Sequence, residues 1–396
     1  MNALTQYLSR NVRDYGMMAA LVMIVIVFQV LTDGKILESP AIASLITQNA
    51  YVFILTIGMV MVIVAGHIDL SVGSVVAFVG GVTGWLMINQ GLPWPLVVVL
   101  AIGVGALVGV WQGFWIAYVG IPAFIVTLAG MLIFRGLAIV IAGTTISGFP
   151  QGFKNIAGGY IPAWFGFAGP FDLLTLLIGI VAIVGLVVAG LRKRAVLHRE
   201  GLHSEPLLAW IVKTAVIAAL IGFVTYKLAT NVVADPTSTG TPIVLVIVGL
   251  LVLTYTFVMN RTVFGRHIYA IGGNLHAAVL SGVNTKRVNF MIFVNMGVLA
   301  GVAGVVTTSR AGASIAAAGV NFELDAIAAA FIGGTAVTGG IGKVSGAIIG
   351  ALIMGVLNMG LSLMNVPAEW QQTVKGLVLL AAVAFDILNK RRNAAA

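Results

Sequence analysis

Long apolar segments recur along almost the whole chain and restrict its fold more than any other feature. A helix needs about 20 apolar residues to cross the hydrocarbon core of a bilayer, and fewer where it is buried in protein. Candidate segments are 16–31, 42–65, 72–88, 95–118, 121–142, 173–191, 207–228, 241–259, 288–309, 326–340, 344–364 and 373–388. We therefore predict an all-α, polytopic membrane protein with about 10–12 transmembrane helices in one domain over residues 1–396.

The composition agrees with a chain whose main solvent is lipid. Of 396 residues, 60% are hydrophobic and only 8% are charged, while soluble domains carry roughly 25% charged residues. The chain has no cysteine, which excludes disulfides and thiolate chemistry. The apolar run 16–31 follows basic residues but is not followed by an Ala-x-Ala-like cleavage site, so we expect it to remain as the first membrane helix.

Basic residues are concentrated in alternate loops and predict an orientation. They cluster at 192–199, at 261–287 and at 390–392, and the intervening loops hold almost none. Lys and Arg collect in cytoplasmic loops of membrane proteins. The net charge of +9 is therefore read as a membrane topology signal, not as a nucleic-acid-binding surface, with both termini in the cytoplasm.

Short motifs recur at similar offsets in the two halves of the chain. GAL (105–107) and IPA (121–123) correspond to GAL (350–352) and VPA (366–368), and HIDL (67–70) before Gly80-Gly81 corresponds to FELD (322–325) before Gly333-Gly334. Such pairs are typical of inverted repeats in transporters, although few identities in a Gly- and Ala-rich chain could also arise by chance.

Small residues at every fourth position predict close helix packing. Gly105, Gly109 and Gly113 have this spacing, which lets two helix backbones approach each other in lipid. A nucleotide-binding reading fails for the stretch 337–344, because Val stands at both ends where a phosphate-binding loop requires Gly and Ser or Thr.

The loop 260–287, NRTVFGRHIYAIGGNLHAAVLSGVNTKR, is too patterned for a simple connector. Residues 275–280 form a plausible short helix between a Gly-Gly-Asn turn and Ser281-Gly282. A short helix with basic flanks can dock a cytoplasmic partner, or it can anchor on anionic lipid headgroups. The composition leaves both readings open.

This loop and several other stretches resemble one family. His276-Ala277-Ala278 followed by Gly282 is similar to the Glu-Ala-Ala…Gly loop of ABC permeases, with His in place of Glu. HIDLSVGS (67–74), IPAFIVTLAG with FRG (121–136), FELDAIAAAFIGGT (322–335) and NVPAEW with VKG (365–376) also match. The chain thus resembles permease subunits of bacterial ABC sugar importers of the ribose/xylose type.

The resemblance implies a translocation subunit of the bacterial inner membrane that is not itself an enzyme. Members typically have ten helices, form homodimers, and pair with a cytoplasmic ATPase subunit and a periplasmic sugar-binding protein. No cofactor is expected on this chain, because ATP and Mg²⁺ bind to the partner ATPase. An apparent inserted helix pair at 173–228 is similar to the D-xylose permeases rather than to the shorter ribose type, which favours xylose.

The resemblance also predicts which residues of the cytoplasmic coupling loop 260–287 contact the ATPase. These are Gly265, Arg266, Gly273, Asn274, His276, Ala277, Ala278, Ser281 and Gly282.

Polar and charged side chains in or beside apolar segments are costly and mark possible pathway residues, and for a neutral sugar amides with an aromatic surface suffice. Our candidates are Gln48, Asn49, His67, Asp69, Asn295, Phe322 and Asn358. Asp69 could equally cap or brace the following helix, and His67 could be an ordinary buried histidine. No further acid or histidine lies near them at metal-ligand spacing, so we predict no metal site.

Four charged residues fall in or beside apolar segments without an obvious transport role. We expect Arg135 and Lys375 to pair with a carbonyl or a carboxylate. Glu323 and Asp325 could hold a broken helix, help to dock a sugar-binding protein, or be ordinary solvent-facing acids.

Two other functions are compatible with a polytopic membrane chain. A proton-coupled secondary sugar transporter needs titrating carboxylates near the membrane centre, and Asp69 is the main candidate for that role. A membrane enzyme is less favoured, because no arrangement of acid, base and nucleophile stands out.

Overall fold

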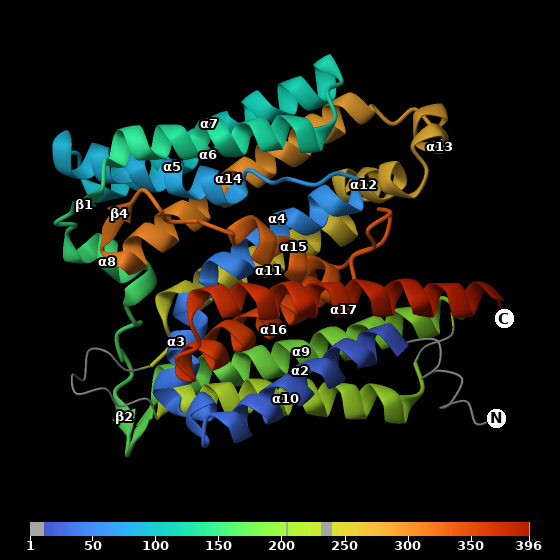
Figure 1. The fold of residues 1–396 in the computed structure, drawn as a ribbon. Helices are drawn as coiled ribbons and strands as arrows, with labels where there is room; N and C mark the ends of the chain where they lie inside the picture. The colour runs from blue at the N-terminus through green and yellow to red at the C-terminus, as the bar shows by residue number, and fades with distance from the viewer. Residues whose placement is uncertain (1–11, 203–204, 231–239, 396) are drawn as a thin grey trace.

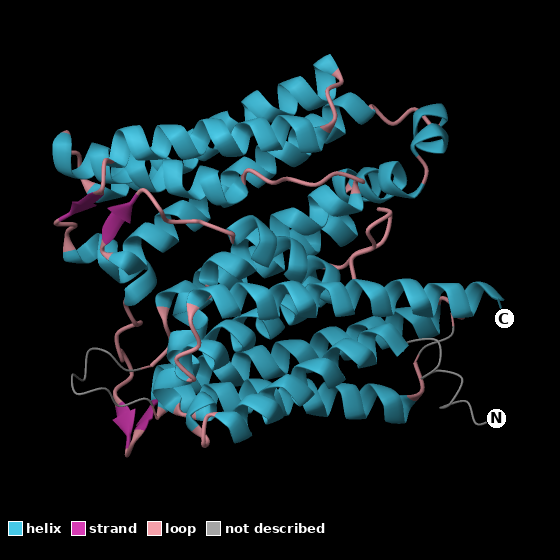
Figure 2. Ribbon diagram, in the orientation of Figure 1, coloured by secondary structure: helices cyan, strands magenta, loops and turns pink. Residues whose placement is uncertain are grey.

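The computed structural model describes residues 12–202, 205–230 and 240–395, and it is a bundle of helices of which most run roughly parallel or antiparallel to one another (Figures 1 and 2). Each predicted apolar segment contains a helix. The longer helices are α2 (Val12–Leu31), α4 (Ala50–Val64), α5 (Val72–Gly84), α6 (Trp94–Phe114), α7 (Ala123–Ala142), α9 (Leu173–Arg199), α10 (Leu207–Ala229), α11 (Ile243–Arg261), α14 (Thr285–Ala311), α16 (Val344–Leu363) and α17 (Ala368–Ala395).

Shorter elements connect these helices or extend them. They are η1 (Lys35–Leu37), α3 (Ser39–Gln48), the π-helical turns η2 (Trp85–Asn89) and η3 (Trp115–Val119), α8 (Gln151–Gly158), α12 (Val263–Gly273), α13 (Leu275–Leu280) and α15 (Phe322–Ile332). Two antiparallel pairs are the only sheets in the described part of the chain: β1 (Thr145–Ser147) with β4 (Ala313–Ile315), and β2 (Phe167–Ala168) with β3 (Phe171–Asp172).

Within the described residues, eight helices are long and apolar enough to cross a membrane. The pair α3 and α4, bent by 45° at Asn49, makes a ninth if it is counted as one span. The predicted segment 326–340 is not a full span. Its helix α15 has 11 residues, or about 16 Å at the usual helical rise, which is roughly half of the hydrocarbon thickness.

Helix α4 forms the centre of the bundle. Every residue from Val52 to Val64 is buried, and α4 packs against α14, α15 and α16. A helix that is apolar on all sides and buried on all sides belongs to the interior of a large helical protein. It places the end of α3 and the start of α15 beside each other.

The predicted glycine packing is confirmed at the contact of α6 with α14. A methyl group added at Gly105 would overlap the backbone of Gly297 and Gly301, and one at Gly109 would overlap the backbone of Phe293 and Val294. The two helices therefore touch backbone to backbone, which is the close approach that small residues permit in lipid.

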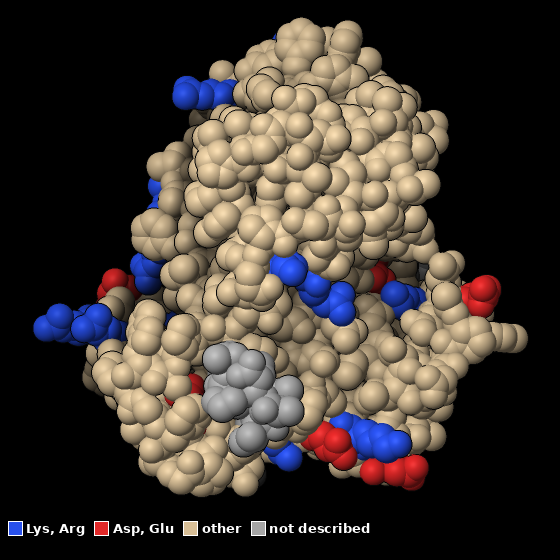
Figure 3. All heavy atoms as spheres, turned by 90° about the vertical axis from the view of Figure 1, so that its left-hand side faces the viewer, with Lys and Arg blue, Asp and Glu red and all other residues tan. Residues whose placement is uncertain are grey.

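The two ends of the bundle differ in what they carry. Helix α2 begins and α17 ends at the same end as α13, and α8 and the two small sheets lie at the opposite end (Figure 1). Figure 3 views that opposite end, where most of the visible atoms belong to uncharged residues.

The segment 173–228 forms the helices α9 and α10, which pack mainly on each other. Gly179 receives the side chain of Thr225, and Gly190 receives the ring of Trp210. Asp172 begins α9 by accepting hydrogen bonds from the backbone N–H groups of Leu174 and Thr175. The pair lies at the side of the bundle that also contains α2 (Figure 1).

Candidate translocation and coupling sites

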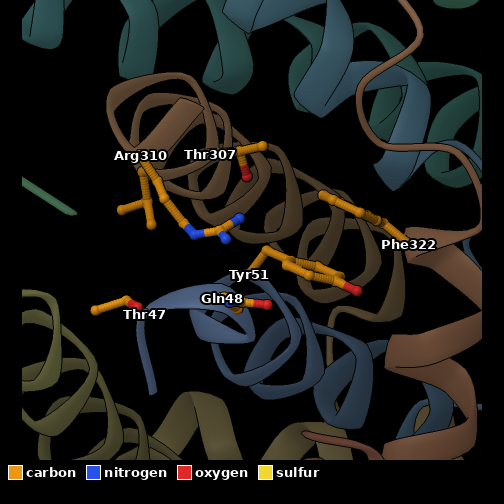
Figure 4. A pocket seen from close by; sticks show the side chains of 7 residues that line it. Thr47, Gln48, Tyr51, Thr307, Arg310 and Phe322 are labelled. Carbon is orange, nitrogen blue, oxygen red and sulfur yellow. The ribbon is translucent and has the colours of Figure 1, made fainter. Parts of the chain in front are cut away.

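A small cavity that contains several polar side chains lies where α3, α4, α14 and α15 meet (Figure 4). Its volume is about 50 Å³, and it is lined by Thr47, Gln48, Tyr51, Val306, Thr307, Arg310 and Phe322. The Arg310 side chain extends from the last turn of α14 into the space between Thr307 and Tyr51 (Figure 4). A cavity of this volume has room for only a few water molecules. It is therefore too small for a sugar ring.

A stacked aromatic pair forms one wall of the cavity. The rings of Tyr51 on α4 and Phe322 at the start of α15 are 3.5 Å apart with an interplanar angle of 13°. The pair joins two elements that are far apart in sequence. Any widening of the cavity toward α15 has to separate these rings.

Asp325 of α15 lies one turn after Phe322 and connects α15 with α4 and α17. Its carboxylate accepts a hydrogen bond from the Tyr51 hydroxyl at 2.7 Å and forms an ion pair with Lys375 of α17 at 3.1 Å. The expected pairing of Lys375 with a carboxylate is confirmed. Asp325 and Glu323 are both buried in the first turn of α15, so their interpretation as solvent-facing acids is wrong.

We expect Lys375→Met to destabilise the chain. The Asp325 side chain is only 5% exposed, and losing the partner of a buried charge costs a few kcal/mol, here about 2 kcal/mol because Lys375 is partly exposed. Thermal unfolding in detergent measures the change. The double variant Asp325→Asn with Lys375→Met should recover part of the loss.

A matched control is available in the more exposed pair Lys213–Glu205, whose side chains are 38% and 27% exposed and whose N–O distance is 3.5 Å. Exposed ion pairs contribute little, so Lys213→Met should leave the unfolding temperature almost unchanged. Equal effects at Lys213 and Lys375 would contradict the assignment of Asp325 as a buried junction.

Of the predicted pathway residues, Gln48 and Phe322 line the cavity. Asn49 lies at the bend between α3 and α4, where its Oδ1 accepts a hydrogen bond from Asn358 Nδ2 of α16 at 2.9 Å. Asn49 and Asn358 therefore tie α16 to the bend next to Gln48. Their roles in transport remain predictions.

Asp69 belongs to a different polar group. Its Oδ1 accepts hydrogen bonds from the backbone N–H and the hydroxyl of Ser71, at 2.8 and 2.6 Å, and Gln112 Nε2 donates to the same hydroxyl at 2.7 Å. Asp69 thus braces the residue that precedes α5. This geometry favours the local structural role over contact with substrate.

The start of α5 lies directly against the start of α15. A methyl group at Gly73 would overlap the carboxylate of Glu323 and the carbonyl oxygen of Gly319. The segment before α15 is also held by α7: Arg135 donates hydrogen bonds to the carbonyl oxygens of Ala316 and Ala318 at 3.2 and 2.7 Å. The expected pairing of Arg135 with a carbonyl is confirmed, and it fixes the segment that leads into α15.

His67 and Asn295 lie in other surroundings. His67 packs beside the ring of Phe293, with centroids 5.8 Å apart, and Asn295 Oδ1 accepts a hydrogen bond from the Tyr255 hydroxyl of α11 at 3.1 Å. Neither residue lines the cavity. The cavity residues Thr47, Tyr51, Thr307 and Arg310 were not singled out from the sequence.

The coupling loop folds into two helices. The predicted helix 275–280 is present as α13, and Asn274 begins it by accepting a hydrogen bond from the N–H of Ala277 at 3.0 Å. Gly282 ends it with a φ of +79°, a conformation that Gly adopts without strain. The stretch 263–273, not predicted as a helix, forms α12, so Gly272 and Gly273 end that helix instead of forming an isolated turn.

Helix α13 lies at the end of the bundle where α17 ends (Figure 1), and its exposed side chains are mostly apolar. Leu275 and Val279 are half exposed, Leu280 is 89% exposed, and Ala278 is buried beneath them. Arg266 and His276 are exposed nearby. The predicted coupling residues therefore surround a projecting apolar helix with basic neighbours.

The many membrane-length helices, the interrupted helices and the small cavity between them define a polytopic membrane permease. Residues 41–383 match the family described as "Branched-chain amino acid transport system / permease component". The match covers most of the chain, so the chain belongs to this family of permease components.

Among curated proteins, the chain is similar to two kinds of sugar permease. It is 42% identical to the xylose transport system permease protein XylH of Escherichia coli (strain K12) over 97% of this chain and 94% of that protein. It is 38% identical to XylH of Haemophilus influenzae (97% and 98% coverage). It is 30% identical to the ribose import permease protein RbsC of Escherichia coli (strain K12) (88% and 85% coverage). No solved structure matches the chain.

Proposed function

We propose that this chain is the translocation subunit of an ATP-driven importer of D-xylose. The observation that carries the proposal is the similarity to XylH over nearly the full length of both chains, at 42% identity against 30% for RbsC. The transport system comprises a cytoplasmic ATPase subunit, a periplasmic sugar-binding protein and a second copy of this chain. ATP and Mg²⁺ bind to the ATPase subunit.

The arrangement of the two ends supports an orientation in the bacterial inner membrane. The end with α12 and α13 faces the cytoplasm, because basic residues collect in cytoplasmic loops and Arg266, Lys286 and Arg287 flank α13. The largely uncharged end seen in Figure 3 then faces the periplasm and the sugar-binding protein. Both termini lie in the cytoplasm in this orientation.

The sugar passes beside the cavity of Gln48, Arg310 and Phe322. Hydroxyl and amide groups can replace the hydration of a neutral sugar, and aromatic faces suit its apolar side. A cavity of about 50 Å³ cannot hold the sugar, so transport requires the Tyr51–Phe322 pair to open. In this proposal the structure has the sugar pathway closed by the Tyr51–Phe322 pair.

Uptake by intact cells tests the sugar assignment. In a bacterial strain that lacks its own pentose permeases but keeps the cognate ATPase and sugar-binding protein, this chain should raise uptake of labelled D-xylose at least about tenfold over an empty vector. Labelled D-ribose should accumulate much more slowly. Equal uptake of both sugars, or uptake of ribose alone, would contradict the assignment to xylose.

A further inference from the structure

Helix α12 packs directly on two places where membrane helices end. One is the end of α4 at Val64, before the stretch 65–71, and the other is the stretch 333–343, which follows α15. Only Asn274 separates the end of α12 from the start of the coupling helix α13. A displacement of α13 by a partner therefore reaches α12 first.

Two contacts join α12 to these two places. The Tyr269 hydroxyl donates a hydrogen bond to the carbonyl oxygen of Gly342 at 2.7 Å. At Gly272, an added methyl group would overlap the carbonyl oxygen of Val64. Backbone therefore lies on backbone at this point.

The same Val64 carbonyl also holds the second of these places. It accepts a hydrogen bond from the N–H of Gly340 at 2.8 Å. The end of α4, the end of α12 and the turn after α15 thus meet at one point. None of them can shift alone without breaking this backbone contact, and leaving a backbone polar group without its partner inside the protein is costly.

The turn after α15 is stiff enough to transmit a displacement. Ala336 N–H donates to Ile341 O at 2.8 Å, and Thr335 N–H donates to Ala330 O at 3.0 Å. These bonds close the turn on itself and on the last turn of α15. At its other end, α15 carries Phe322 of the aromatic pair and Asp325 of the buried junction.

We propose that Tyr269 and Gly272 transmit the movement of the coupling helices to α15, which opens the cavity by separating Phe322 from Tyr51. The proposal rests on the function proposed above, in which a cytoplasmic ATPase acts on α13. Tyr269 is then a positioning residue. It contacts neither the ATPase nor the sugar, and its removal should uncouple ATP hydrolysis from transport without preventing assembly.

Tyr269→Phe removes the hydroxyl and little else. In proteoliposomes with the ATPase and the sugar-binding protein, sugar transported per ATP should fall about three- to tenfold, as expected for the loss of one hydrogen bond. Co-purification of the ATPase and its rate of hydrolysis should stay within about twofold of the parent. Tyr255→Phe is the matched control, because Tyr255 also donates one hydrogen bond, to Asn295 on a different helix, and should remain coupled.

A thiol in the cavity gives a second readout that a purely structural role would not change. The chain has no cysteine, so Thr47→Cys introduces a unique thiol beside the aromatic pair. Its reaction with a soluble maleimide should accelerate when ATP and the loaded sugar-binding protein are added. In the Tyr269→Phe background this acceleration should be lost.

Gly272→Ala tests the backbone contact, with Gly249→Ala as its control because a methyl group at Gly249 meets nothing within 4 Å. Full coupling and normal thiol acceleration in both Tyr269→Phe and Gly272→Ala would overturn the proposal. Loss of ATPase binding in Tyr269→Phe would also overturn it, by placing the residue in the docking surface. Failure of the unmodified chain to bind an ATPase would instead contradict the proposed function.

Discussion

Gly109→Val is expected to abolish accumulation of the folded protein. Gly109 lies on α6 at its crossing with α14, and a side chain there would enter the backbone of Phe293 and Val294. The packed interior cannot yield locally, because both obstacles are main-chain atoms. We expect a loss of about 3 kcal/mol or more, which is at the upper end for overpacking.

The control lies on the same helix. Gly103 also belongs to α6, but a methyl group there meets nothing within 4 Å, so Gly103→Val should fold normally. The measurements are the monodisperse fraction after size-exclusion chromatography in detergent and the midpoint of thermal unfolding. Similar yields and unfolding temperatures for Gly109→Val and Gly103→Val would contradict the backbone-to-backbone contact of α6 with α14.

Ala278→Glu is expected to abolish association with the ATPase. Ala278 is the one buried residue of α13 and is only 4% exposed, so a glutamate there must push α13 away from α12 or bury a carboxylate without a partner. The displaced helix would no longer present Leu275, Val279 and Leu280 to the ATPase. Co-purification of a tagged ATPase subunit should fall to background, with ATP-dependent uptake lost.

The control for Ala278→Glu is Ala195→Glu. Ala195 is an exposed residue near the end of α9, outside the coupling loop, and its substitution introduces the same charge. It should bind the ATPase normally. If Ala278→Glu also co-purifies with the ATPase and hydrolysis stays coupled to sugar, the loop is a lipid anchor rather than a docking segment.

The sequence predicts the helices well because their signal is local. Runs of apolar residues and the spacing of Gly105, Gly109 and Gly113 depend only on neighbours along the chain, and the structure contains a helix at each predicted segment. The bend at Asn49 was missed because neither Pro nor Gly marks it. Helix α12 was not predicted because its 11 residues include three glycines, which usually indicate turns.

The cavity was only partly predictable because it is made by contacts distant in sequence. Gln48 and Phe322 are predictable as an amide and an aromatic group in or beside apolar runs. Arg310 lies in the last turn of α14, where a basic residue is usual, but it extends into the cavity (Figure 4). Asp325 and Tyr51 are 274 positions apart, and no periodicity along the chain indicates that they meet.

Sugar transport by purified components tests the central claim most directly. The chain is reconstituted into liposomes alone and together with the cognate ATPase and sugar-binding protein, and entry of labelled D-xylose is followed. We expect uptake only when both partners and ATP are present, with no response to a proton gradient. Uptake by the chain alone, driven by a proton gradient, would contradict the assignment and identify a secondary transporter.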